Sequence, residues 1–167
     1  MNQNEYINQK YYDTYKRVEQ EIKSSPFCIV AISGVTGGGK SDLSRYLSCR
    51  LDLSCLETDL FLRSVETKVG YDYAYIHGIL EHRRKIKRNI IVDGCSLCPV
   101  LCWFERSETF LIHIENRRPS DRPKDELIDF ENSETYSIKE MPNVENADLN
   151  PDSPSCLKAC ANYTIRW

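Results

Sequence analysis

Residues 34–41 read Gly-Val-Thr-Gly-Gly-Gly-Lys-Ser and match the phosphate-binding pattern G-x-x-x-x-G-K-[ST] at every fixed position. An apolar run at residues 27–33 precedes this segment and predicts a buried strand, and apolar side chains at helical spacing follow it in residues 43–51. In a strand–turn–helix arrangement, backbone N–H groups and the start of the helix can surround a phosphate. The sequence therefore predicts a site for a nucleoside triphosphate.

We call residues 34–41 the phosphate-binding loop. Lys40 is expected to reach the β- and γ-phosphates, and the Ser41 hydroxyl is expected to bind Mg²⁺. The alternative is a chance glycine-rich turn in front of a helix. The residues expected to contact the nucleotide are Gly34, Val35, Thr36, Gly37, Gly38, Gly39, Lys40 and Ser41.

Segments typical of strands and helices alternate along the rest of the chain. This alternation predicts an α/β fold, with a parallel sheet of about five strands, helices on both faces and the strand of residues 27–33 in the centre. A helix over residues 3–23 is expected to pack on the sheet edge. We expect further strands at 53–57, 89–94, 109–114 and 163–166, helices at 73–88, 96–105 and 124–131, and a loop at 64–72.

The 167 residues fit one domain, with an N-terminal helix (1–25), a core (26–135) and a C-terminal segment (136–167). A net charge of −3 argues against a general partnership with nucleic acid or a membrane surface. The polar N-terminal residues lack an apolar stretch, so we expect a cytoplasmic protein.

The chain has eight cysteines, including the C-x-x-C pair Cys95 and Cys98. We expect free, buried thiols here, and a metal or redox role remains the alternative.

Two acidic residues follow expected strands and should therefore share one edge of the sheet with the phosphate-binding loop. We expect Asp93, after an Ile-Ile-Val strand, in the Mg²⁺ shell, and Asp59 as the base that takes a proton from a substrate hydroxyl. The alternative for both is a capping aspartate.

Residues 116–126 are charged, contain two prolines and are typical of a mobile loop. We expect Arg117, Arg118 and Arg122 to close over the transferring phosphate and to stabilise its charge. Their alternative is solvated surface charge.

The chain resembles the uridine kinase-like branch of the P-loop small-molecule kinases over roughly residues 25–130. The resemblance is carried by SPFCIVAISGVTGGGKSDLSRYL, TDLF, NIIVDGCSL and IHIENRRPSDR. It implies a P-loop NTPase fold, with ATP and Mg²⁺ as cofactors and a small-molecule hydroxyl as the phosphate acceptor. In that family the acid matching Asp59 is the base, the acid matching Asp93 ends the next strand, and an arginine-bearing lid follows.

One departure concerns the acceptor site. Only 33 residues lie between Asp59 and Asp93. Uridine kinases have a longer insert with a hairpin that embraces the nucleoside, whereas here we expect one helix to fill the space. Tyr71, Asp72 and His77 are candidate substrate contacts, with packing and helix capping as alternatives.

Two other functions stay open: a nucleotide-hydrolysing switch or ATPase that controls a partner, and a nucleotide-binding protein that has lost catalysis. A guanine-reading N-K-x-D element and a D-x-x-G element after a strand are both missing from the sequence, which argues against a regulatory GTPase. The combination of Lys40, Ser41, Asp59 and Asp93 argues against lost catalysis.

Overall fold

A computed structural model of the protein describes residues 3–35, 37–65, 68–94, 97–115 and 161–166. Five parallel strands form one sheet in the order β2-β5-β1-β6-β7, which confirms the predicted α/β fold with the first strand in the centre. The strands are β1 (Ile29–Gly34), β2 (Ser54–Glu57), β5 (Ile90–Asp93), β6 (Thr109–Ile114) and β7 (Tyr163–Ile165).

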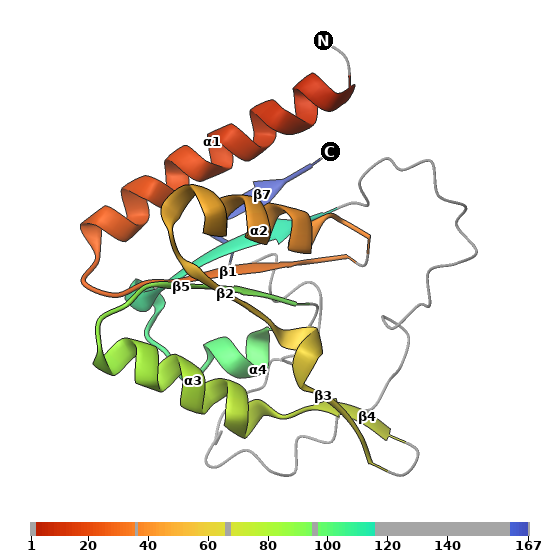
Figure 1. Ribbon diagram of the computed structural model, residues 1–167, viewed down its shortest axis with the longest axis vertical. Helices are drawn as coiled ribbons and strands as arrows, with labels where there is room; N and C mark the ends of the chain where they lie inside the picture. Colours follow the sequence, from red (N-terminus) through yellow and green to blue (C-terminus); the bar gives the residue numbers. More distant parts are fainter. Residues whose placement is uncertain (1–2, 36, 66–67, 95–96, 116–160, 167) are drawn as a thin grey trace.

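Helices cover both faces of the sheet (Figure 1). α1 (Gln3–Ser24) and α2 (Lys40–Leu51) lie on one face, and α3 (Tyr73–Lys85) and the short α4 (Cys98–Leu101) lie on the other. Val30 and Ile32 of β1 belong to the first core, and Ile29 and Ala31 belong to the second. Because successive side chains of a strand point to opposite faces, a strand covered on both faces is apolar throughout, which explains the run before the phosphate-binding loop.

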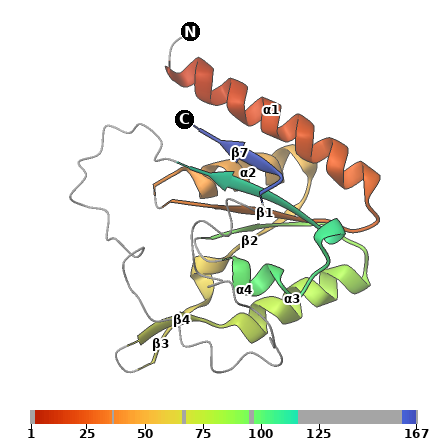
Figure 2. The ribbon, with the colours of Figure 1, turned by 180° about the vertical axis from the view of Figure 1, so that it is seen from behind.

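The N-terminal helix α1 packs across a face of the sheet rather than on its edge. Its Ile7 and Val18 share a core with Ile112 of β6 and Ile165 of β7. The guanidinium of Arg17 lies 4.4 Å from the centre of the ring of Tyr163. Figure 2 shows β7 beneath this helix, so α1 and α2 together close one face.

The connection from β2 to α3 contains a hairpin, so the predictions of a loop over 64–72 and of a lone helix in this connection are wrong. The one-turn helix η1 (Thr58–Phe61) leads into β3 (Leu62–Val65), which pairs antiparallel with β4 (Lys68–Tyr71). The N–H of Asp72 donates to the carbonyl oxygen of Phe61 over 2.9 Å and closes the base of the hairpin. α3 then begins, with the Asp72 carboxylate accepting from the N–H of Tyr75.

α4 is shorter than the helix predicted over 96–105. Leu97, Val100 and Phe104 are all buried, and this periodicity accounts for the longer prediction. The next turn, η2 (Arg106–Glu108), is a separate one-turn helix in front of β6.

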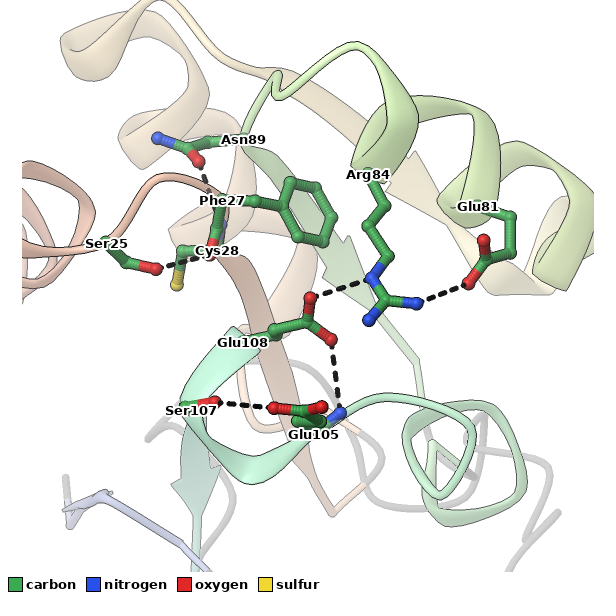
Figure 3. Close-up of polar contacts among 9 residues, drawn as sticks. All are labelled: Ser25, Phe27, Cys28, Glu81, Arg84, Asn89, Glu105, Ser107 and Glu108. Carbon is green, nitrogen blue, oxygen red and sulfur yellow. Dashed lines mark hydrogen bonds and ion pairs between the residues drawn. The ribbon is translucent and has the colours of Figure 1, made fainter.

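Polar contacts join the elements at the amino edge of the sheet, where its strands begin (Figure 3). Arg84, in the last turn of α3, donates to Glu108 of η2 over 2.7 Å and to Glu81 over 3.4 Å. The Asn89 side chain accepts the N–H of Cys28 over 2.8 Å, where β1 and β5 begin. These contacts lie at the edge opposite the carboxyl ends of the strands.

Candidate functional site

The carboxyl ends of β1, β2, β5 and β6 lie together, because all four strands run parallel. Gly34 ends β1, Asp93 ends β5, and Asp59 lies in η1 directly after β2. The structure therefore places the phosphate-binding loop and both predicted acids at one edge of the sheet. Ligands of open parallel sheets bind at this edge.

The glycines of the phosphate-binding loop are required by its path. Gly34, Gly37 and Gly39 have φ values of 136°, 74° and 84°, which side-chain-bearing residues rarely adopt. At Gly34 a Cβ would also lie 2.2 Å from the carbonyl oxygen of Ile114 on the neighbouring strand. The chain can thus turn out of β1 against β6 and enter α2, whose N-terminal cap is Gly39.

Lys40 is the first residue of α2 and is 8% exposed. Its ammonium group donates to the carbonyl oxygens of Gly34 over 2.9 Å and of Val35 over 3.0 Å. An ammonium group has three donors. The positive charge is therefore held inside the loop, beside the helix start whose partial positive charge also favours an anion.

Asp93 is 3% exposed and lies beside α2. Its carboxylate accepts the Ser44 hydroxyl over 2.7 Å. Burial raises the pKa of the Asp93 carboxyl; hydrogen bonds from Ser44 and Ser41 oppose the rise, and the charges of Glu57 and Asp59 add to it. The side-chain oxygens of Asp93 and of Ser41, the last residue of the phosphate-binding loop, thus lie within hydrogen-bond distance of each other.

Two polar residues of this edge escaped the sequence analysis. Glu57 lies in register with Asp93 on the neighbouring strand and pairs with Arg45 of α2 over 2.9 Å. Ser44 binds Asp93 directly. The helical spacing of Ser44 from Lys40 and the position of Glu57 at a strand end were the available signals.

Asp59 differs from Asp93 because its side chain is exposed. It accepts the hydroxyl of Tyr71, the last residue of the hairpin, over 3.0 Å. The other candidate substrate contacts serve in helix capping or packing. Asp72 caps α3, and the ring of His77 packs edge-on against the ring of Trp103, with ring centres 4.4 Å apart.

The residues present fit a magnesium ion bound together with a nucleotide. Mg²⁺ is commonly held by one or two protein oxygens, with phosphate oxygens and water completing its shell. Ser41 and Asp93 can supply those protein oxygens. Within the described ranges, His, Cys, Asp and Glu side chains form no group of three or more that would hold a metal by themselves.

The cysteines are less buried than the sequence predicts. Among the four cysteines described as free, Cys28 is buried, Cys55 is half-buried, and Cys49 and Cys102 are exposed. The expectation of buried thiols is therefore only partly met. The helices of the described residues include none long and apolar enough to cross a bilayer.

Several predictions concern residues outside the described part of the chain. These residues are Thr36, Cys95, Arg117, Arg118 and Arg122, together with the helix expected over 124–131.

No family model and no curated protein sequence matches the chain. A solved structure described as a possible uridine kinase from Bacillus stearothermophilus is similar to it, with a TM-score of 0.52 and 13% sequence identity. The similarity covers 66% of this chain and 82% of the other. The chain therefore shares the α/β fold of that structure, in agreement with the predicted P-loop NTPase fold.

Proposed function

We propose that the protein is an ATP-dependent phosphotransferase that acts on a small-molecule hydroxyl, in the manner of uridine kinases. The observation that carries the proposal is the difference between two acids at one edge of the sheet. Asp93 is buried beside the loop hydroxyl Ser41, whereas Asp59 is exposed at the base of a hairpin. A metal-shell acid and a base for an incoming hydroxyl need these two settings.

On the nucleotide side, the backbone N–H groups of the phosphate-binding loop surround the phosphates. Lys40 exchanges the carbonyl oxygens of Gly34 and Val35 for β- and γ-phosphate oxygens, which are stronger acceptors because they are charged. Ser41 and Asp93 would hold Mg²⁺, which would supply positive charge to the phosphate oxygens.

On the acceptor side, Asp59 accepts the proton of the substrate hydroxyl. The hydroxyl oxygen then bonds to the γ-phosphorus while the bond from that phosphorus to the β–γ bridging oxygen breaks, and ADP leaves. The hairpin of β3 and β4 follows η1 directly, where the kinases that the sequence resembles embrace a nucleoside. This hairpin supports a uridine kinase-like acceptor site. Arg117, Arg118 and Arg122 are proposed to add positive charge around the transferring phosphate.

The test is a phosphotransfer screen of the whole protein with Mg²⁺ and ATP or GTP against nucleosides and other small hydroxyl compounds. Phosphorylated acceptor and ADP are measured in parallel. We expect ADP release that depends on an acceptor and equals the transferred phosphate. Hydrolysis that responds only to a protein partner would instead identify a nucleotide-driven switch.

Two variants separate the roles of the acids. Asp59→Asn should lower transfer by about 10²-fold and leave ATP affinity nearly intact, because it removes the base alone. Asp93→Asn should weaken the Mg²⁺ dependence of ATP binding. Asp52→Asn, an exposed position at the far end of α2, is the matched control and should change neither. Equal losses of ATP affinity in the two site variants would mean that both acids serve the metal.

A further inference from the structure

The hydroxyl of Tyr71 donates to Oδ1 of Asp59 over 3.0 Å. The contact joins two elements that are close in space but twelve residues apart in sequence, because Tyr71 ends β4 and Asp59 lies in η1. An exposed aspartate on a one-turn helix has little else to fix its side-chain rotamer. This hydrogen bond therefore selects one orientation of the Asp59 carboxylate.

The donor is itself held in place by the hairpin. Tyr71 faces Leu62 across the hairpin in register, and the backbone bond from Asp72 to Phe61 closes the next position. The ring of Tyr71 packs against the ring of Tyr73, with centres 5.7 Å apart. The ring that carries the hydroxyl is thus held in place by its neighbours. The orientation of the Asp59 side chain therefore depends on the pairing of β3 with β4.

The chemistry at the carboxylate leaves room for both partners. Tyr71 occupies Oδ1 as a hydrogen-bond donor, and a carboxylate has a second oxygen, Oδ2, with its own lone pairs. A base must meet the substrate proton at hydrogen-bond distance and in line, so orientation decides its efficiency. Because the Tyr71 hydroxyl keeps its own proton in this hydrogen bond, it is not the base, and the substrate proton goes to the Asp59 carboxylate.

We infer that Tyr71 is a positioning residue, which holds Oδ2 of Asp59 towards the acceptor hydroxyl and makes the base competent when the hairpin is formed. This inference rests on the proposed phosphotransferase function. It assigns Tyr71 to the base and not to direct recognition of the acceptor.

The test is a double-mutant cycle of the wild-type protein, Tyr71→Phe, Asp59→Asn and the double variant, assayed with both substrates varied. Tyr71→Phe should lower kcat about tenfold and leave the KM values for ATP and acceptor within about twofold. In the Asp59→Asn background the same change should have less than about a twofold effect, because the base it positions is gone. Tyr75→Phe, which removes an exposed tyrosine hydroxyl nearby, is the control and should leave kcat unchanged.

Two kinetic results would overturn the inference while phosphotransfer stands. A raised acceptor KM at unchanged kcat would show that Tyr71 contacts the acceptor. An equal loss in both backgrounds would show that it acts independently of Asp59.

A second measurement does not depend on turnover. The ¹³C chemical shift of the Asp59 carboxyl carbon should change in Tyr71→Phe and stay constant in Tyr75→Phe. An unchanged shift in Tyr71→Phe would overturn the inference, whether or not an acceptor has been found. Failure of transfer in the wild-type protein, with the carbon shift responding as expected, would instead count against the proposed function.

Discussion

Lys40 is the residue on which the proposed nucleotide site should most depend. Its ammonium group is held within the phosphate-binding loop by two backbone carbonyl oxygens, so the charge is in place before a ligand arrives. Such preorganisation lowers the cost of ordering a long side chain on binding. Because the group is largely buried, the charge is screened less by water and salt than a surface charge would be.

Replacing Lys40 with alanine should therefore weaken the binding of ATP–Mg²⁺ by about 2 kcal/mol, or roughly 30-fold, since hydrogen bonds to charged phosphate oxygens are lost. Isothermal titration calorimetry measures the change. Lys85→Ala, at an exposed position in the last turn of α3, is the matched control. Unchanged affinity in Lys40→Ala would mean that the glycine-rich loop is structural.

The buried carboxyl of Asp93 predicts a pH dependence of stability. Its pKa is raised on folding, mainly by burial. The folded state therefore holds this proton to higher pH than the unfolded state does, and folding stability falls as the pH rises from the unfolded pKa through the folded one. Asparagine keeps a hydrogen-bonding group for Ser44 and has no charge to bury.

Asp93→Asn should consequently gain stability relative to the wild-type protein as the pH rises from about 4 to 7, with unfolded aspartate titrating near the lower value. Urea denaturation at both pH values gives the difference, and Asp52→Asn should show no such trend. A difference that is constant with pH would indicate that Asp93 does not titrate anomalously in the folded protein.

Among the helices and strands, those with mostly buried side chains were predicted correctly from the sequence. Strand β1 is apolar from Ile29 to Ile32 because both of its faces are covered, and α2 follows a motif with fixed positions. The β3–β4 hairpin was missed because its two four-residue strands are joined by Glu66 and Thr67, not by a glycine-containing turn, and because Gly70 suggested a breaker. The pairing of Tyr71 with Asp59 depended on that hairpin and could not be read from the sequence.

Thr58 and Gly94 approach each other closely at the junction between the ends of β2 and β5. Thr58 donates to the carbonyl oxygen of Asp93 over 3.0 Å, and a Cβ on Gly94 would lie 1.9 Å from the Thr58 hydroxyl oxygen. Gly94→Ala should lower the free energy of unfolding by about 2–3 kcal/mol, because backbone or Thr58 must move. Gly78→Ala, in the middle of α3 with open space around it, should raise it by about 0.5–1 kcal/mol.

Chemical denaturation of the two glycine variants provides both numbers. The clash can be located by repeating Gly94→Ala in a Thr58→Ala background, where the hydroxyl is absent and the penalty should shrink. A penalty that stays equal in both backgrounds would contradict this account of the junction.

Across the whole molecule, the sheet separates two kinds of polar group. Its carboxyl edge carries the residues of the candidate site: the phosphate-binding loop, Asp93 and Asp59. Its amino edge carries hydrogen bonds and ion pairs that join α3, η2 and the starts of β1 and β5 (Figure 3). A parallel sheet produces this division because every strand presents the same end at each edge.

The division predicts that stability and nucleotide binding respond to different substitutions. Arg84 is 38% exposed and bridges Glu81 and the better-buried Glu108, whose side chain also accepts the N–H of Glu105 at the start of η2. Arg84→Ala leaves Glu108 without its cation, so it should lower the free energy of unfolding, and only slightly because water screens a partly exposed ion pair. The expected result is a small fall in Tm. ATP affinity should stay unchanged, because the bridge lies at the opposite edge from the phosphate-binding loop.

Scanning calorimetry and ATP titration on the same samples check both parts, with the exposed Arg88→Ala as a control that should alter neither quantity. Lys40→Ala should give the reverse pattern, with a loss of affinity larger than any loss of stability. If Arg84→Ala weakened ATP binding as strongly as it lowered Tm, the two edges would be coupled through β1 and β5. The carboxyl edge could then not be treated as a site built on an independent scaffold.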